Sequence, residues 1–338
     1  MTEFVTSYGL FLAKTITFVI ALLIIIASIM GLSGKSRKPK GELSIEHKND
    51  EYKYYQDHLH QVILSKEQQK QRHKQQKRDE KAQRKAAQKI KPGEEVISRK
   101  RMYIVNFKGD IHASQVDELR ETITALLKVA TTQDEIVIGV ESPGGQVHGY
   151  GLAASQLARI RARKIPLTVV VDKVAASGGY LMACVADQII AAPFAILGSI
   201  GVVAQLPNFH RLLKKHDVDY EQLTAGEYKR TLSLFAENTA QGREKFQQEI
   251  DDTHELFKQF VKTYRAHLDI EQIATGEHWF GTRALELHLI DKIQTSDDYF
   301  LACSEQADLY EVKYELKKSF SERFHLAVTT ALAGVISR

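Results

Sequence analysis

Ser177 stands in a run of small residues, Ala175 to Gly179, between a strand-like apolar stretch and a helix-like one. Such a run can serve packing alone, because small residues let a helix lie close to a sheet. It can also leave a hydroxyl group exposed beside free backbone amides, as a nucleophilic serine requires. The start of a helix further favours negative charge at this position. The local sequence therefore allows either packing or nucleophilic catalysis.

Two further segments have residues suited to the same chemistry. ESPGG, residues 141–145, follows an apolar run, and paired glycines at a strand end let the backbone approach a ligand closely. TAGEYKR, residues 224–230, sets Lys229 beside Tyr228 and near small residues. Taken singly, a turn explains the glycines and a solvated side chain explains the lysine. The spacing of the glycines also does not fit the dinucleotide-binding fingerprint.

Together these motifs resemble those of the S49 peptidases, the relatives of signal peptide peptidase A. The matching segments are ESPGG, VAASGGY, GSIGV at 198–202, TAGEYKR and EHWFGTRALELHLIDKI at 277–293. The resemblance holds in order and spacing as well as in residue type. It implies an α/β fold like that of Clp protease and crotonase, with stacked βαβ units, and a serine peptidase activity.

The resemblance also implies roles for four residues. Ser177 matches the nucleophile and Lys229 the general base, whereas Gly145 and Gly178 match the residues whose amides form the oxyanion hole. A lysine acts as a base only where burial or nearby dipoles favour its neutral form. We therefore expect Lys229 in a largely apolar pocket. Other family members form rings in which the serine and the lysine come from different subunits, and this arrangement is open for the present chain.

Histidines near the motifs provide an alternative base. His148 follows ESPGG and His278 lies in EHWF, but a triad also needs an orienting acid, and nothing marks Asp172 as that partner. His148 is instead expected to touch substrate, as are Gly144 and Tyr228. The lysine-based mechanism is the favoured one.

The remaining candidate residues indicate no metal or cofactor chemistry. Cys184 and Cys303 are far apart and form no paired motif, so we expect neither a disulfide framework nor a zinc site. Cys184 is expected in the core, as are Trp279 and Phe280. No metal and no cofactor is therefore assigned.

Alternating strands and helices must position these residues. Apolar runs predict strands and 3.6-residue spacing predicts helices. The strands are expected at 101–107, 135–140, 167–172 and 188–193, and the helices at 114–129, 148–164, after Ser177, at 243–267 and at 283–290. This alternation indicates a largely parallel sheet with right-handed crossovers, whose ligand sites lie beyond the carboxyl ends of the strands.

Residues 1–40 are predicted to form a membrane anchor. Thr15–Leu32 has no charged residue, and its length is near the lower limit for a single transmembrane helix. A cleaved signal peptide is the alternative, but the first basic residue is Lys14 and no clean cleavage site follows. The resemblance to the S49 peptidases implies the bacterial inner membrane as the location. The basic residues at 35–40 favour a cytoplasmic domain, whereas the resemblance suggests a periplasmic one.

Three further regions follow the anchor. Residues 41–98 are predicted to be a basic helical stalk, because 65–91 is rich in Gln, Lys, Arg and Ala and has no apolar face. It is either a solvated spacer or a segment that lies on anionic lipid headgroups; nucleic-acid binding lacks aromatic support. Residues 99–300 are assigned to the peptidase domain. Residues 301–338 are a tail for docking or oligomerisation, since its apolar stretch is too short to span a membrane.

The leading hypothesis is a membrane-anchored endopeptidase with a Ser-Lys dyad. The anchor implies membrane lipid as a partner. The resemblance implies other copies of the chain, and peptide substrates that are membrane-derived, signal-peptide-like or unfolded. A crotonase-like acyl-CoA enzyme would use glycine amides similarly but needs no such serine and lysine together. A non-catalytic scaffold of the same fold is the third hypothesis. The net charge of +4 over 338 residues favours no polyanionic partner.

Overall fold

The computed structural model describes residues 8–19, 41–88 and 99–316 of the chain. The chain divides into two units, one formed by Met1–Glu42 and Leu316–Arg338 and the other by Leu43–Glu315. In the first unit residues 8–19 are helical. No helix among the described residues is both long and apolar enough to cross a bilayer. Most of the predicted anchor, from residue 20 onward, lies outside the described residues.

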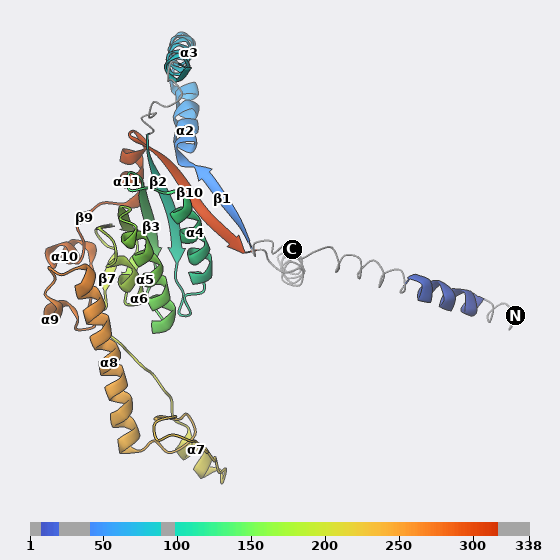
Figure 1. The fold of residues 1–338 in the computed structure, drawn as a ribbon, viewed down its shortest axis with the longest axis vertical. Helices are drawn as coiled ribbons and strands as arrows, with labels where there is room; N and C mark the ends of the chain where they lie inside the picture. The colour runs from blue at the N-terminus through green and yellow to red at the C-terminus, as the bar shows by residue number, and fades with distance from the viewer. Residues whose placement is uncertain (1–7, 20–40, 89–98, 317–338) are drawn as a thin grey trace. The chain divides into compact units, whose positions relative to one another are not determined.

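Among the described residues, a seven-stranded sheet forms the centre of the larger unit (Figure 1). Its order is β1 (Gly41–His47), β10 (Ala307–Leu316), β2 (Lys100–Lys108), β3 (Glu135–Glu141), β4 (Leu167–Val171), β6 (Gln188–Ala191) and β9 (Lys292–Ile293). All pairings from β10 to β9 are parallel. The central strands are buried on both faces, which is why they consist of nearly continuous Val and Ile. The predicted parallel α/β sheet is confirmed.

The sheet extends beyond the predicted limits of 99 and 300. β1 lies in the predicted stalk and β10 in the predicted tail, so both regions begin with folded structure. The Asn49 side chain in α2 (Lys48–Ile63) joins the N-terminal region to α11 (Ser296–Ser304) and β10. Its Nδ2 donates to the carbonyls of Ser304 and Ala307 at 3.0 Å, and its Oδ1 accepts from the Leu309 amide at 2.7 Å. The sheet thus needs residues from both flanks.

Helices cover the two faces of the sheet. α4 (Val116–Val129), α5 (Val147–Ala162) and α6 (Gly178–Ala183) pack on one face in the main core, and α11 packs on the other. The apolar positions predicted for α4 are all buried: Val116, Leu119, Ile123, Leu126 and Leu127. Each such buried side chain contributes roughly 1.5–3 kcal/mol. α3 (Lys66–Gln88) follows α2 and is helical, as expected for the basic segment.

A smaller sheet and a long helix complete the unit. β5 (Val174–Ala176), β7 (Ile196–Gly198) and β8 (His278–Phe280) form a three-stranded sheet beside the large one. α8 (Ala240–Tyr264) is followed by α9 (Ile270–Ile273) and α10 (Gly281–Glu286). Residues 204–239, here called the arm, contain α7 (His210–Lys215) and lie beyond the first turns of α8, away from the sheets (Figure 1).

Aromatic residues at β8 have different environments. Trp279 is partly buried against the core, as predicted, and its ring leaves no room for a side chain on Gly198. The expectation of a core position for Phe280 was wrong, because it is 50% exposed. Its ring meets that of Phe194 edge to face at 6.1 Å. Alternation along a short strand directs these two neighbours to opposite faces.

Candidate active site

Ser177 occupies a strained turn between β5 and α6. It is the N-cap residue of α6, with φ +52° and ψ −118°, a backbone conformation that is costly for a residue with a side chain. Its amide donates to the Gly198 carbonyl at 2.8 Å, which fixes the turn to β7. The side chain is half-buried. A sharp strand-to-helix turn of this kind displays a hydroxyl at the edge of a sheet.

The ESPGG segment lies directly against Ser177, as the strand order predicted. Ser142 forms a bridge with β5: its amide donates to the Val174 carbonyl at 2.8 Å, and its carbonyl accepts from the Ala176 amide at 3.0 Å. Gly144 has φ +93°, and a Cβ there would lie 2.7 Å from the Ser177 Cβ. Only glycine fits this position, both in conformation and in space.

Two backbone amides beside Ser177 are available as donors. Within the described parts of the chain, no acceptor is recorded for the N–H of Gly145 or of Gly178. The neighbouring amides are occupied, since Gly144 donates to Ser142 Oγ at 3.1 Å and Gln146 donates to the Ile111 carbonyl at 2.8 Å. Gly178 opens α6, so its amide is one of the unpaired donors of a helix start. Both predicted glycines therefore have free N–H groups near the hydroxyl.

Tyr150 lies beneath these segments and was not singled out from the sequence. It is fully buried in the first turns of α5, and its hydroxyl donates to the Asp110 carbonyl at 2.8 Å. The same oxygen lies 2.5 Å from Ser142 Oγ. Burial raises the pKa of Tyr150, so its hydroxyl remains protonated at neutral pH.

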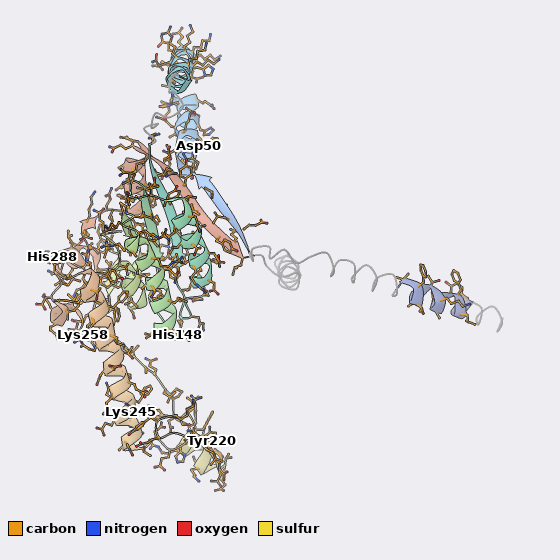
Figure 2. All side chains as sticks on the ribbon, viewed as in Figure 1. Asp50, His148, Tyr220, Lys245, Lys258 and His288 are labelled. Carbon is orange, nitrogen blue, oxygen red and sulfur yellow. The ribbon has the colours of Figure 1, made fainter. Side chains whose placement is uncertain are left out.

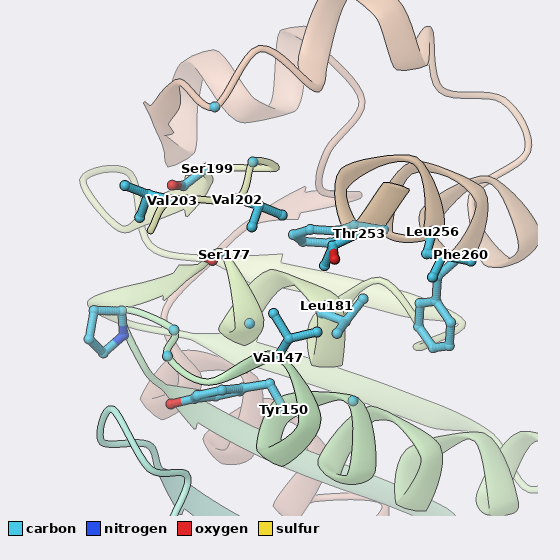
Figure 3. A pocket seen from close by; sticks show the side chains of 18 of the residues that line it. Val147, Tyr150, Ser177, Leu181, Ser199, Val202, Val203, Thr253, Leu256 and Phe260 are labelled. Carbon is cyan, nitrogen blue, oxygen red and sulfur yellow. The ribbon is translucent and has the colours of Figure 1, made fainter. Parts of the chain in front are cut away.

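A cavity of about 840 Å³ opens beside Ser177 (Figure 3). Gly144, Gly145 and Gly178 line it together with Ser177, and most of the remaining wall is apolar. That wall includes Val147, Leu181, Val202 and Val203, and a face of α8 formed by Thr253, Leu256, Phe257 and Phe260. The α8 residues have the spacing of one helix face, but the sequence did not indicate that this face borders a cavity.

Lys229 lies in the arm, near the start of α8, whereas the cavity is bordered by a later part of the same helix. It is exposed in a turn of the arm, where its amide donates to the Gly226 carbonyl at 3.2 Å. The neighbouring Tyr228 ring lies 5.3 Å from Lys245 Nζ, near the start of α8. Lys245 and Thr253 are about 12 Å apart along the helix axis, at 1.5 Å per residue. Within one chain the structure does not bring Lys229 to Ser177, and the apolar pocket expected around Lys229 is not found there.

Figure 2 shows the same separation: Lys245 lies on the part of α8 toward the arm residue Tyr220, whereas Lys258 lies farther along the helix, away from the arm. Tyr220 belongs to an aromatic cluster within the arm. Its ring lies 5.6 Å from that of Phe235, which lies 6.0 Å from that of Phe209. The arm therefore has a small apolar centre of its own, separate from the main core.

The histidine alternatives find no support in the geometry. His148 and His278 are exposed, and neither borders the cavity. Asp172 binds the start of α11 instead of orienting a histidine. Its carboxylate accepts a hydrogen bond from the backbone amide of Ser296 at 2.8 Å and another from the hydroxyl of Ser296 at 2.5 Å. Of the three expected substrate contacts, Gly144 lines the cavity, whereas His148 and Tyr228 do not.

The cysteines are not part of the site. Cys184 is buried in the core, as predicted, and burial raises the pKa of its thiol, so it is unreactive at neutral pH. Cys303 is partly buried at α11. Within the described residues, no cluster of His, Cys, Asp and Glu has the arrangement of a metal site.

The chain matches two known family models along most of its length. Residues 3–157 match the N-terminal region of peptidase family S49, and residues 159–310 match peptidase family S49 itself. A protein of Haemophilus influenzae named probable protease SohB is 49% identical, over 100% of this chain and 97% of that protein. A protein of the same name from Buchnera aphidicola subsp. Acyrthosiphon pisum is 47% identical, over 98% and 96%.

Two solved structures are similar at lower identity. One is a mutant of the 1510-N membrane-bound stomatin-specific protease in complex with a substrate peptide. It has 15% identity and a TM-score of 0.42, over 69% of this chain and 100% of that one. The other is ClpP1 from Listeria monocytogenes, with 15% identity and a TM-score of 0.39, over 58% and 93%.

Proposed function

The chain belongs to peptidase family S49, and from that premise we propose that it is a membrane-anchored serine endopeptidase with Ser177 as nucleophile and Lys229 of a neighbouring subunit as general base. The observation that carries the proposal is the meeting of three features at one point. Ser177 stands in a strained turn, the amides of Gly145 and Gly178 have no acceptor recorded in the described chain, and an apolar cavity opens beside them.

This arrangement suits acyl transfer. Ser177 Oγ attacks the carbonyl carbon of the scissile peptide bond while the lysine amine takes its proton. The carbonyl oxygen becomes an oxyanion that accepts hydrogen bonds from Gly145 and Gly178, each worth roughly 3–4 kcal/mol by comparison with other serine proteases. The protonated lysine then donates to the leaving amine. A water molecule, deprotonated in turn by the lysine, hydrolyses the acyl-enzyme.

The base is assigned to a neighbouring subunit because of where the arm lies. The arm holds Lys229 beyond the first turns of α8 and exposes apolar side chains, among them Leu212, Tyr220 and the 94% exposed Leu223. Exposed apolar groups clustered on one segment are typical of a protein interface. In an oligomer of this chain, the arm of one subunit would be covered by its neighbour and would carry Lys229 to that neighbour's cavity.

The cavity supports apolar peptide substrates. Its aliphatic and aromatic wall has room for large side chains next to the scissile bond, and burying such groups contributes roughly 1.5–3 kcal/mol each. Membrane-derived, signal-peptide-like and unfolded polypeptides are rich in these residues and are the proposed substrates.

Attachment to the bacterial inner membrane is proposed from the sequence. The uncharged stretch Thr15–Leu32 is the proposed anchor. α3 has six lysines and three arginines against three acidic residues, so its net charge of +6 favours anionic lipid headgroups beside that anchor.

Labelling with a fluorophosphonate probe, read by intact mass on the detergent-solubilised chain, tests the nucleophile and the base. We expect labelling of the wild type, loss in Ser177→Ala and in Lys229→Ala, and retention in Lys215→Ala, which removes another exposed arm lysine. A wild type that is folded but unlabelled would contradict the proposal.

Mixing the two inactive variants tests the shared site. A mixed oligomer of Ser177→Ala and Lys229→Ala subunits pairs an intact serine with an intact lysine only across a subunit boundary. Hydrolysis of a fluorogenic leucine-containing peptide by the mixture, but by neither variant alone, is the expected result. An inactive mixture that does exchange subunits would place the dyad within one chain.

A further inference from the structure

We infer that Tyr150 is a positioning residue that holds both halves of the oxyanion hole in register. The inference rests on the function proposed for Ser177. It arises from one fully buried side chain that contacts both segments: the ESPGG segment just before it in sequence and the distant turn at Gly178.

The hydroxyl of Tyr150 holds the backbone of the ESPGG segment in place through a chain of hydrogen bonds. Its single proton goes to the Asp110 carbonyl at 2.8 Å, so the proton shared with Ser142 at 2.5 Å is donated by Ser142 Oγ. Ser142 Oγ in turn accepts from the Gly144 amide at 3.1 Å. These bonds fix the orientation of the Gly144 peptide, and the next amide along the chain is the free donor of Gly145.

The ring of Tyr150 supports the backbone of Gly178, which carries the second amide of the oxyanion hole. A Cβ built on Gly178 would lie 2.3 Å from Tyr150 Cγ, so the backbone of Gly178 rests on the ring without any intervening side chain. The ring is itself held edge to face against Phe107, with centroids 6.3 Å apart. A shift of the ring would therefore move the Gly178 amide.

The loop after β2 closes this arrangement from a third side. A Cβ on Gly109 would lie 2.3 Å from the Tyr150 hydroxyl, and a Cβ on Gly145 would lie 2.2 Å from the Ile111 carbonyl oxygen. Three loops thus meet around one tyrosine, and glycines stand at the points of closest approach, Gly109, Gly144, Gly145 and Gly178. An oxyanion hole needs donors fixed within fractions of an ångström, and a support of this kind supplies that precision.

Tyr150→Phe tests the role, because it removes only the hydroxyl and keeps the ring beneath Gly178. We expect kcat for a fluorogenic leucine peptide to fall about 10- to 100-fold with KM within about twofold, less than the loss of a whole donor. Affinity for a peptide leucinal should fall in parallel, because its adduct with Ser177 places an oxygen anion in the same hole. Ground-state peptide binding should not change.

Tyr180→Phe is the matched control. Tyr180 is equally buried, and its hydroxyl donates to a single carbonyl, that of Leu289, at 2.8 Å. This variant loses one buried hydrogen bond of the same kind and should keep kcat. Ser142→Ala should lower kcat about as much as Tyr150→Phe. The double variant should have a kcat only slightly below that of either single variant, because both substitutions break the same chain of hydrogen bonds.

The outcomes separate the two levels of the proposal. If wild type is labelled by the fluorophosphonate while Tyr150→Phe keeps the wild-type kcat and leucinal affinity, the positioning role is wrong and the proposed function stands. Equal losses in Tyr150→Phe and Tyr180→Phe, or a raised KM alone, would also overturn the role. A folded wild type that takes no label would overturn both.

Discussion

The ammonium group of Lys245 lies 5.3 Å from the centre of the Tyr228 ring and ties the arm to the first turns of α8. Gln241 adds a second tie, since its amide donates to Glu227 Oε1 at 3.2 Å. The other end of the same helix lines the cavity beside Ser177. α8 thus borders the cavity at one end and contacts the arm that carries Lys229 at the other, as expected if each subunit contributes to two sites in the proposed oligomer.

The arm should unfold independently when its aromatic centre is weakened. Phe235→Ala removes the ring that packs on both Phe209 and Tyr220, at a cost of about 1–2 kcal/mol for this partly exposed residue. We expect faster limited proteolysis within residues 204–239 and labelling reduced to the level of Lys229→Ala, with the thermal unfolding of the main domain unchanged. If the chain were still fully labelled by the fluorophosphonate after cleavage of the arm, Lys229 would not be the general base.

A methyl group at Gly178 should disrupt the site and the fold around it. In Gly178→Ala the new Cβ meets the buried Tyr150 ring at 2.3 Å, so either the ring or the amide must move. We expect the free energy of unfolding to drop by about 1–3 kcal/mol and activity to fall more than 100-fold. Chemical denaturation and peptide hydrolysis measure the two effects.

Gly151→Ala provides the comparison for stability. Gly151 lies in α5, and a methyl group at this position would have nothing within 4 Å, so the change should stabilise the helix by about 0.5–1 kcal/mol. Similar losses of stability in the two variants would mean that the close approach of Gly178 to Tyr150 does not matter.

A charge on the α8 wall should impair apolar substrates selectively. Leu256 lines the cavity and is 59% exposed, so Leu256→Glu should leave stability within about 0.5 kcal/mol. We expect kcat/KM for a peptide with leucine at the cleavage site to fall about tenfold, as for the loss of one apolar contact. Leu301→Glu, at a 58% exposed position of α11 outside the cavity, should have wild-type kinetics. Equal kinetics in both variants would argue against a substrate at this wall.

Acid should destabilise the fold partly through Asp134. Burial alone would raise the pKa of this carboxyl, but hydrogen bonds from Arg101 and Thr131 outweigh it and hold the pKa below its ordinary value. Arg101 binds both carboxylate oxygens, at 2.9 and 2.8 Å. The unfolded chain therefore takes up the proton first as the pH falls, and the stabilisation present at neutral pH is lost below about pH 5.

Asp134→Asn isolates this contribution. The variant should be less stable than wild type at pH 7 by about 1–3 kcal/mol, and the difference should shrink between pH 5 and about pH 3. Urea unfolding across this range measures it. A difference that stays constant with pH would assign the loss to packing instead of to the ion pair.

The sequence was sufficient for the parts of the fold that depend on local patterns. The buried face of α4 and the strands β2, β3 and β4 follow from apolar spacing, and the meeting of Ser177 with the ESPGG glycines follows from parallel strand order. β10 was not predicted, although ADLYEVKYEL has the apolar–polar alternation of a half-buried strand. What the sequence does not show is its partner, because β2 lies some 200 residues earlier. No local signal reports a pairing at that distance.

Parts of the site depend on packing between distant segments and were not readable. Tyr150 looks like any apolar position of a helix until the loops at Gly109, Ser142 and Gly178 are seen to meet at it. The wall formed by α8 has the spacing of an ordinary core helix. In the proposed function the position of Lys229 relative to Ser177 depends on a neighbouring subunit, and the sequence of one chain does not describe that contact.

The place of β10 between β1 and β2 has a consequence for the order in which the protein is made. Translation at about 5–20 residues per second delivers β2, β3 and β4 well before β10. Until Ala307 and the residues after it have emerged, the edge of β2 is open and β1 has no neighbour in the sheet. Closure of this edge is therefore a late event of synthesis, and a chain that stops short of residue 307 presents a bare strand to proteases and chaperones.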